Sequence, residues 1–316
     1  MIFRRNVLIL HQGALGDFVT SWPLAMAMGR MFPQSRIIYI TSREKGRLAE
    51  RAVRVEAGDT EDGWHMLFAE SPKVPESVAK LLAGAHTIFS FISQPGDVVS
   101  RNLQGIAPHA NRFDMTTNAT PGSGHVSQRL VDDLKPLPAA AEAVRQMLRS
   151  IADRGLGTHR PVGRTVTLHP GSGADRKNWP AERFLELAAA LRNAGHDIFT
   201  VLGEVEQEKW SPELIARFEA AGRVVTPKTF VDLYEELIRT AAFIGNDSGP
   251  GHLAGIIGVP TVSIFGSSDP ASWHPLGPRT AVVHRDSLDG VQVADVLEAL
   301  RGVGAVTQGE ALRSVS

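Results

Sequence analysis

Cysteine is absent from this chain of 316 residues, and its absence excludes several kinds of chemistry at once. Without a thiol the protein forms no disulfide, carries no thiolate nucleophile and offers no cysteine ligand to zinc or to an iron–sulfur cluster. A chain of this size that folds without disulfides is typical of the cytoplasm. We therefore predict a cytoplasmic protein.

Long hydrophobic runs are also missing. The apolar run nearest the N-terminus covers only residues 7–10, which is shorter than the apolar core of a signal peptide. No stretch reaches the ~18 apolar residues that a membrane-spanning helix needs. The sequence therefore predicts neither a signal peptide nor a transmembrane helix, and it leaves peripheral contact with a membrane open.

An excess of one charge and the common hydrolase and metal motifs are missing as well. The 33 Lys and Arg residues nearly balance the 34 Asp and Glu residues, so the net charge of −1 does not indicate nucleic-acid binding. The motifs G-x-S-x-G and H-E-x-x-H are absent, and the 11 histidines lack the spacing of a metal site. No pair of carboxylates at fixed spacing indicates a glycosidase. We expect no metal, no cofactor and no nucleic-acid partner.

The length and two similar stretches predict two domains, since domains typically hold roughly 100–200 residues. Each half begins with an apolar strand, a glycine-containing loop, a helix and a second strand, which is the order of a parallel βαβ unit. The expected strands and helices of these units cover residues 6–10, 19–32 and 37–40, and then 165–168, 180–193 and 197–202. A linker over residues 155–163 separates the predicted domains, 1–157 and 158–316.

The expected fold class is α/β, with two Rossmann-like domains that face each other across a cleft. The other patterns predict strands over residues 87–92, 242–245 and 261–265, and helices over residues 126–134, 230–240, 252–257 and 291–300. Residues 94–104 and 116–124 are predicted to be loops. The last helix is a candidate to pack back on the N-terminal domain.

The first loop suited to chemistry covers residues 13–17. Gly13 and Gly16 lie at a strand-to-helix turn, where a ligand is able to approach the backbone and the helix N-terminus favours an anion. The loop is not G-x-G-x-x-G, so it does not predict a dinucleotide site. Asp17 is either a helix N-cap or a general base, and the spacing alone favours the N-cap.

The second loop covers residues 169–180. Gly171 and Ser172 precede Arg176 and Lys177, and a helix follows. Loop amides together with a fixed ammonium suit a pyrophosphate where no metal is present. The alternative is an ordinary exposed basic pair, which we prefer for Arg176.

The third loop covers residues 246–252. Ser248 and Gly249 are placed to present amides to phosphate oxygens, and Asp247 is placed to bond sugar hydroxyls. The alternative is a well-capped turn in which His252 makes a satisfied polar contact. The residues alone leave these two interpretations nearly even.

In combination, these loops resemble glycosyltransferase family 9, the lipopolysaccharide heptosyltransferases. The matching segments, in chain order, are residues 13–17, 169–173, 177–180, 245–254, 258–261 and 265–270. They cover most of the second half and about the first 40 residues, and their order and separation are specific. The resemblance implies a GT-B fold and an inverting, metal-independent transfer of a heptose from an ADP-activated, nucleotide-diphosphate sugar to a lipopolysaccharide-core-type acceptor.

The resemblance also implies roles for single residues. Asp17 matches the catalytic base and Lys177 the group that stabilises the leaving diphosphate, while Glu206 matches the acidic residue that holds the ribose. Lys228 lies where the family contacts the base through the backbone. The implied substrate-binding residues are Gly13, Gly16, Gly171, Ser172, Glu206, Lys228, Asp247, Ser248, Gly249 and His252. For Asp17, Lys177 and Asp247 the resemblance outweighs the alternative interpretations.

Two departures affect the acceptor side. His11 stands where many relatives have Arg or Lys, and residues 89–94 differ from the acidic-plus-Gln strand end that relatives often show. Residues 50–150 match little, so the acceptor is not specified. The donor is implied to lie mainly on the C-terminal domain and the acceptor on the N-terminal one.

Four arginines form a stripe in the first half. Arg43, Arg47, Arg51 and Arg54 fall on one face if residues 43–54 are helical, and Lys45 lies off that face. A solvated charged face is the favoured interpretation. The alternative is a docking surface for an anionic glycolipid or sugar acceptor, or for the cytoplasmic face of the inner membrane.

Two other functions compete with the heptosyltransferase. One is a GT-B sugar-nucleotide enzyme with a different donor, and the other is a non-catalytic sugar-nucleotide-binding protein. The second keeps Lys177 and Asp247 but predicts donor binding without transfer.

Overall fold

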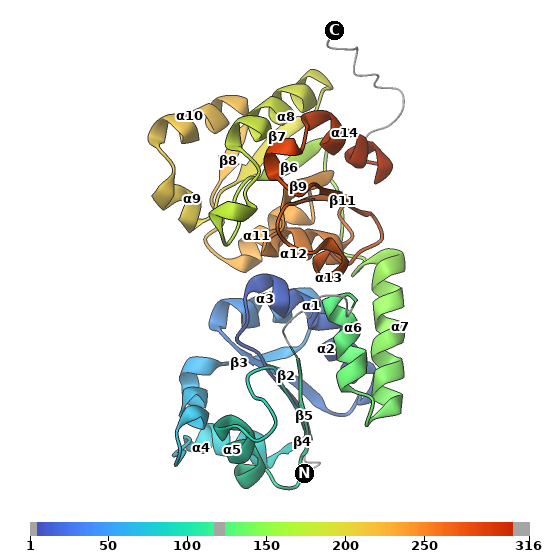
Figure 1. Cartoon of the computed structure of the whole chain (residues 1–316). Helices are drawn as coiled ribbons and strands as arrows, with labels where there is room; N and C mark the ends of the chain where they lie inside the picture. The colour runs from blue at the N-terminus through green and yellow to red at the C-terminus, as the bar shows by residue number, and fades with distance from the viewer. Residues whose placement is uncertain (1–4, 117–123, 306–316) are drawn as a thin grey trace. The chain divides into compact units, whose positions relative to one another are not determined.

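The computed structural model describes residues 5–116 and 124–305, and the chain divides into two compact units, residues 1–150 and 151–316 (Figure 1). Most of the loop predicted over residues 116–124 lies outside the described residues. Each unit alternates strands with helices around its own parallel sheet. The predicted α/β class, with two Rossmann-like domains, is therefore confirmed.

The N-terminal unit holds a five-stranded sheet in the order β3-β2-β1-β4-β5, with every neighbouring pair parallel. Its strands are β1 (Asn6–Leu10), β2 (Arg36–Thr41), β3 (Glu56–Asp59), β4 (Ala85–Ser90) and β5 (Asn111–Asp114). Its helices are α1 (Leu15–Thr20), α2 (Trp22–Met31), α3 (Arg43–Val53), α4 (Glu76–Ala83), α5 (Val98–Ile106), α6 (Val126–Asp133) and α7 (Pro138–Arg154), the last of which crosses the division between the units. All five residues of β1 are buried, as expected for the central strand of a sheet covered on both faces.

The C-terminal unit holds a six-stranded parallel sheet in the order β11-β10-β9-β6-β7-β8. Its strands are β6 (Thr165–His169), β7 (Asp197–Val201), β8 (Arg223–Val225), β9 (Ala242–Asn246), β10 (Thr261–Phe265) and β11 (Thr280–His284). Its helices are α8 (Ala181–Asn193), α9 (Glu204–Lys209), α10 (Pro212–Ala221), α11 (Phe230–Leu237), α12 (Gly249–Ile257), α13 (Pro270–Trp273) and α14 (Val293–Gly302). The last helix, α14, packs on α8, β10 and β11 of this same unit.

Within each unit, the carboxyl ends of the parallel strands lie at one edge of that unit's sheet, and the predicted loops lie at this edge. In the N-terminal unit, residues 11–14 leave the sheet after the central strand β1. In the C-terminal unit, β9, β6 and β7 are neighbours, so the loops that follow them are adjacent. Pro170 and Asn246, which are 76 residues apart in sequence, therefore meet at the edge of the C-terminal sheet.

Three predicted elements are wrong in their extent. The helix predicted over residues 19–32 is two helices, because Pro23 has no N–H for a continuous helix and Ser21 bonds instead to the Phe18 carbonyl at 2.7 Å. The loop predicted over residues 94–104 includes most of α5, which Asp97 caps by accepting the Ser100 N–H at 2.7 Å. The helix predicted from His252 begins at Gly249, because Pro250 suits a first turn.

None of the helices among the described residues is long and apolar enough to span a membrane.

Candidate functional site

Lys177 and Asp247 lie together in the C-terminal unit. Lys177 Nζ donates to Asp247 Oδ2 across 2.7 Å, although 70 residues separate the two. Lys177 ends a single helical turn after β6, and Asp247 directly follows the neighbouring strand β9. The Lys177 side chain is 30% exposed and that of Asp247 only 7%. The pair therefore presents an ammonium to solvent above a buried carboxylate.

Asn246 fixes the loop that carries Lys177. Its side chain, fully buried at the end of β9, accepts the Trp179 N–H at 2.9 Å and donates to the Pro170 carbonyl at 2.7 Å. Trp179 is itself buried, and its indole N–H donates to the Val291 carbonyl at 3.1 Å. One side chain thus ties both ends of the loop to the sheet, which limits the positions that Lys177 is able to take.

Two buried polar atoms next to Asp247 have no hydrogen-bond partner within the described ranges. They are Ser248 Oγ, at the N-cap of α12, and His252 Nδ1, in the first turns of that helix. Burial lowers the pKa of His252 to about 4, attraction to Asp247 opposes the shift, and His274 and Lys177 add to it. The imidazole is therefore neutral at neutral pH. Unpartnered buried atoms of this kind are costly unless a ligand or water completes them.

Glu206 is a buried carboxylate in the first turn of α9. Its Oε2 accepts the Gly203 N–H at 2.8 Å, and a Cβ added to Gly171 would overlap its carboxylate. Burial lowers the pKa of His169, and the nearby Glu206 opposes that shift. Gly171 therefore admits a carboxylate close to the backbone.

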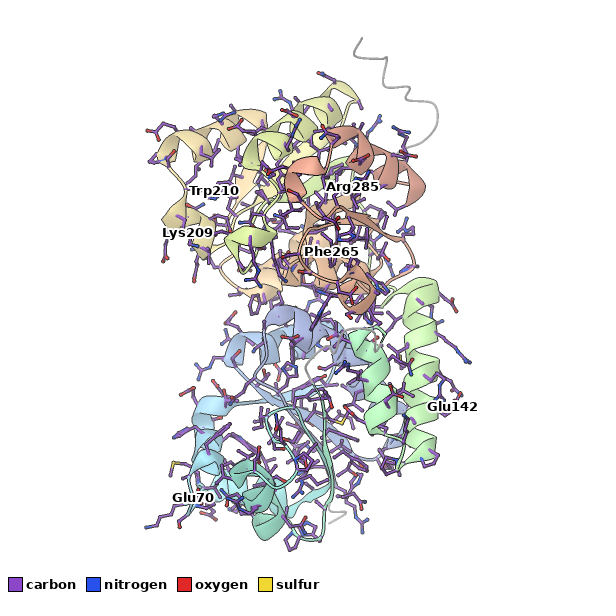
Figure 2. The ribbon with its side chains drawn as sticks, viewed as in Figure 1. Glu70, Glu142, Lys209, Trp210, Phe265 and Arg285 are labelled. Atoms are coloured by element: carbon purple, nitrogen blue, oxygen red, sulfur yellow. The ribbon has the colours of Figure 1, made fainter. Side chains whose placement is uncertain are left out.

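The other residues predicted to bind the donor form no hydrogen bond or ion pair with the Lys177–Asp247 pair among the described residues. Ser172 is buried and donates to the Ala174 carbonyl at 2.8 Å, and Gly249 is the first residue of α12. Asp175, on the same loop, accepts from Lys209 at 3.1 Å, and Lys209 at the end of α9 is labelled in Figure 2. Lys228 is exposed between β8 and α11, and no contact described here joins it to Lys177 or Asp247.

In the N-terminal unit, Asp17 lies inside the first turn of α1, together with Gly16. The N-cap of this helix is Ala14, which has no side chain able to cap, so the N-cap interpretation of Asp17 is wrong. A Cβ added to Gly13 would lie 3.0 Å from Asp17 Cβ, 3.2 Å from Asp17 Oδ2 and 2.9 Å from His11 Cε1. Gly13 therefore leaves the space in which the Asp17 side chain sits.

Two further residues, His11 and Lys45, lie around Gly13 and Asp17, and the sequence assigns neither of them a role in the site. His11 is 1% exposed, with its ring centroid 5.4 Å from that of Phe18 and 5.1 Å from that of Phe91. Burial, with a contribution from Lys45, lowers the pKa of His11 to about 3, so the ring is neutral. Lys45 Nζ donates to the Gly13 carbonyl at 2.6 Å.

The sequence does carry a signal for Lys45. It lies three and four positions before Leu48 and Ala49, which form the buried face of α3. A cation on the apolar face of a helix is unusual enough to mark a specific contact.

The arginine stripe is exposed and only partly helical. Arg43, Arg47 and Arg51 lie on α3, whereas Arg54 is its C-cap in the left-handed region, with φ at 59°. Arg43 pairs with Asp59 at 3.0 Å and Arg47 with Glu44 at 3.8 Å. The predicted helix therefore ends before Arg54, which leaves the stripe one residue shorter.

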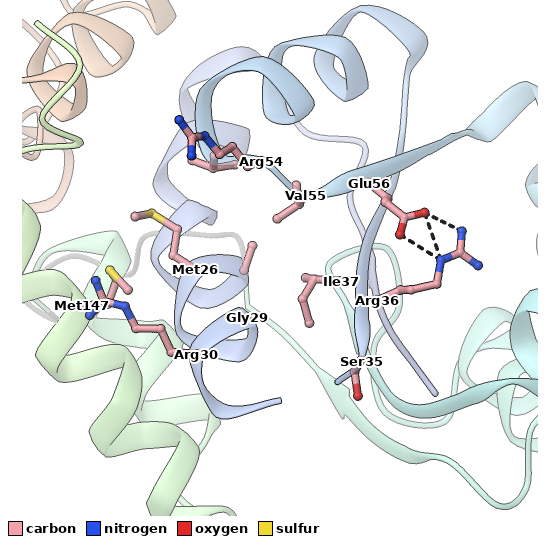
Figure 3. A pocket seen from close by; sticks show the side chains of 12 residues that line it. Met26, Gly29, Arg30, Ser35, Arg36, Ile37, Arg54, Val55, Glu56 and Met147 are labelled. Atoms are coloured by element: carbon pink, nitrogen blue, oxygen red, sulfur yellow. Dashed lines mark hydrogen bonds and ion pairs between the residues drawn. The ribbon is translucent and has the colours of Figure 1, made fainter. Parts of the chain in front are cut away.

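A pocket of about 380 Å³ lies beside the first residues of β2 and β3 (Figure 3). Arg54, Arg30 and Met147 are among the side chains that line it. In Figure 3 the guanidinium groups of Arg30 and Arg54 extend on the opposite side from the ion pair of Arg36 with Glu56, which spans 2.5 Å. This pocket contains none of the predicted catalytic or donor residues.

Within residues 5–116 and 124–305, no group of three or more His, Asp or Glu side chains is arranged to hold a metal ion.

Solved structures resemble the whole chain. A glycosyl transferase family 9 structure from Veillonella parvula superposes with a TM-score of 0.71 at 18% identity, and the match covers 96% of this chain and 98% of that one. The E. coli ADP-heptose lipopolysaccharide heptosyltransferase II has a TM-score of 0.66 at 19% identity, over 94% of this chain and 98% of its own. These likenesses concern the fold, and they confirm the predicted GT-B class.

The sequence comparisons agree with the predicted family. Lipopolysaccharide heptosyltransferase 3 of E. coli K12 is 26% identical over 200 residues, which are 57% of this chain and 56% of that relative. The chain thus spans only about half the length of the curated relatives it matches, or less. The model of glycosyltransferase family 9 (heptosyltransferase) matches residues 131–293, just over half of the chain, and the chain therefore belongs to this family.

Proposed function

We propose that the protein transfers a heptose from an ADP-activated donor to a lipopolysaccharide-core-type acceptor, with inversion and without a metal. The observation that carries the proposal is the Lys177–Asp247 pair, which places an accessible ammonium beside the unpartnered Ser248 Oγ and His252 Nδ1. A diphosphate needs cationic and N–H donors, and a sugar needs directional polar groups, and this part of the C-terminal unit offers both. The family membership and the names of the relatives support heptose as the sugar.

The donor would bind to the C-terminal unit. Lys177 stabilises the charge that grows on the leaving diphosphate, in the place where other enzymes use a metal ion. Asp247 holds Lys177 and accepts from a sugar hydroxyl, while Ser248 and His252 complete their hydrogen bonds on the ligand.

The remaining donor contacts surround this pair. Gly249 begins α12, whose N-terminal amides favour an anion. Gly171 and Ser172 line the same loop, the Glu206 carboxylate accepts from the ribose, and Lys228 contributes its backbone to the base. Because Gly203 already donates to Glu206 Oε2, the other oxygen of this carboxylate is the one we assign to the ribose.

Asp17 would be the general base on the acceptor side. It takes the proton of the acceptor hydroxyl as that oxygen forms its bond to the anomeric carbon and the bond to the diphosphate breaks. Attack from the face opposite the diphosphate inverts the configuration. The proton ends on the Asp17 carboxyl and the negative charge on the nucleotide.

The exposed arginines of α3 suit an anionic acceptor. Arg43 and Arg47 form ion pairs only at the surface, and their side chains are 68% and 58% exposed. A phosphorylated glycolipid at the cytoplasmic face of the inner membrane would bind such a face electrostatically. Binding to this face should therefore weaken as the salt concentration rises.

A donor and acceptor screen tests the proposal. ADP-heptose is expected to bind more tightly than UDP- or GDP-sugars, and heptose should pass to one of a panel of truncated lipopolysaccharide cores. Asp17→Asn is expected to lower kcat by about 10²–10⁴-fold while leaving the donor Kd unchanged. Preference for another nucleotide would contradict the donor assignment, and donor binding without transfer to any core would indicate a binding protein. Near-normal turnover by Asp17→Asn would exclude this residue as the base.

A further inference from the structure

Lys45 is a buried lysine that reaches from α3 to the loop after β1. Only 9% of the residue is exposed. Its Nζ donates to the Gly13 carbonyl at 2.6 Å and lies 3.4 Å from the Gln12 carbonyl. These contacts join two segments more than 30 residues apart in sequence. The ammonium therefore holds the chain at the point where β1 ends and the path to Asp17 begins.

Placing an ammonium here is unfavourable without compensation. Burial lowers the pKa of Lys45, and the main opposing influence is the negative charge of Asp17. An ammonium has three N–H donors, and backbone carbonyls occupy two of them. The arrangement keeps a positive charge beside Asp17 at a cost that ordinary surface lysines do not have.

Two other titratable groups near this loop, His11 and Tyr39, carry no positive charge at neutral pH. His11 packs between Phe18 and Phe91 and is neutral at the pH of a working enzyme. The Tyr39 hydroxyl, on the neighbouring strand β2, is 2.8 Å from Ser21 Oγ, and burial raises the pKa of this tyrosine. Lys45 interacts electrostatically with both His11 and Asp17.

We propose that Lys45 is a positioning residue for Asp17, which holds the Gln12–Gly13 turn against the Asp17 side chain and supplies a positive charge to that part of the loop. Gly13 is the link between the two functions: its carbonyl accepts from Lys45, and its missing Cβ leaves room for Asp17. The catalytic consequence rests on the proposed role of Asp17 as base, whereas the electrostatic coupling does not. Arg43 and Arg47 of the same helix pair instead with Asp59 and Glu44.

The coupling is measured without any substrate. In protein labelled with ¹³C at the aspartate carboxyl, the Asp17 signal is identified by its loss in Asp17→Asn. Lys45→Met is expected to raise the midpoint of the Asp17 titration by about 1 pH unit, because a nearby positive charge is lost. Lys45→Arg keeps the charge, so its Asp17 midpoint should lie close to that of the wild type. Lys80→Met is the matched control, since Lys80 on α4 is 74% exposed and paired with Glu76. An unchanged midpoint in Lys45→Met would overturn the proposal, provided its circular dichroism shows a folded protein.

Turnover tests the consequence for catalysis. With ADP-heptose and the core acceptor that the wild type uses, Lys45→Met should lower kcat, move the acidic limb of its pH profile upward by a similar amount, and leave the donor Kd unchanged. A residue that only supports the fold would not move the profile in this direction or be rescued by Arg. If Asp17→Asn stays active while the titration shift is present, the assignment of the base fails but the coupling stands. If Asp17→Asn is inactive and Lys45→Met keeps the wild-type titration and profile, Lys45 has no positioning role.

Discussion

The burial of His11 allows us to predict how the free energy of unfolding changes with pH. In the folded protein its pKa is lowered from 6.5 to about 3, first by burial and then by Lys45. Between these values the unfolded chain binds a proton that the folded chain does not, so acid favours unfolding. The contribution of His11 to stability is therefore complete above pH 6.5 and declines as the pH falls. Since pH 5 lies about 1.5 units below the pKa of His11 in the unfolded chain, the free energy of unfolding should be about 2 kcal/mol lower at pH 5 than at pH 8.

His11→Phe isolates this contribution. The ring stays aromatic and keeps its neighbours Phe18 and Phe91, but it no longer titrates. Urea unfolding at pH 8 and pH 5, followed by circular dichroism, gives the loss of unfolding free energy on acidification for each protein. We expect that loss to be about 2 kcal/mol smaller in His11→Phe than in the wild type. His252 also titrates, but it is present in both proteins and cancels in the difference.

An exposed histidine provides the control. His65 lies at the surface, so His65→Phe should leave the pH dependence close to that of the wild type. Equal losses in the wild type and in His11→Phe would refute the reasoning, because they would mean that His11 is protonated in the folded protein or accessible to water.

Three further predictions concern the C-terminal unit and the reaction. Lys177→Met should weaken ADP-heptose binding by about 10–100-fold in calorimetry, since a charged hydrogen bond to the diphosphate is lost. Arg176→Met, which removes an exposed neighbouring cation, should change it little. Gly171→Ala should lower stability by about 1–3 kcal/mol, because the new Cβ overlaps Glu206. Gly173→Ala, with open space at its Cβ, should not lower it in the same thermal melts. Transfer should continue in EDTA, and a loss of activity that a divalent cation restores would contradict metal-independent catalysis.

Much of the fold was accessible from the sequence because short apolar strands and glycine loops are local signals. Residues 6–10 and 197–202 were predicted within a residue of β1 and β7. The break at Ser21 was missed, since the apolar pattern continues through it and only Pro23 marks the new helix. The helix α5 was missed because Pro95 and Gly96 resemble a loop, although Asp97 begins a well-capped helix directly after them.

The contacts within the site were less accessible than its residues. The sequence identifies Lys177 and Asp247 as candidates but does not show that they form a pair. Their 2.7 Å ion pair exists because β6 and β9 are neighbours in the sheet, and this strand order is visible only in the structure. The sequence alone places Lys45 off the arginine stripe. Its proposed role depends on a hydrogen bond to the loop that follows β1, and the helical periodicity of the sequence does not predict contacts between distant segments.

The glycines show how a sequence motif and its structural cause differ. Gly13 and Gly171 each follow the first strand of a unit. The sequence predicts that a ligand approaches the backbone at Gly13 and that the amides of the Gly171 loop bind a pyrophosphate. In each unit an acidic side chain lies against the glycine: a Cβ on Gly13 would be 3.2 Å from Asp17 Oδ2, and a Cβ on Gly171 would overlap the Glu206 carboxylate. The two halves therefore use the same device, a glycine that lets an acidic side chain lie against the carboxyl end of the sheet. Their difference follows from the cations: Lys45 is buried and interacts electrostatically with Asp17, whereas Lys177 is partly exposed and pairs with Asp247 rather than Glu206. A buried cation tunes a base and an exposed one remains available to a ligand, which matches the division of roles that we propose.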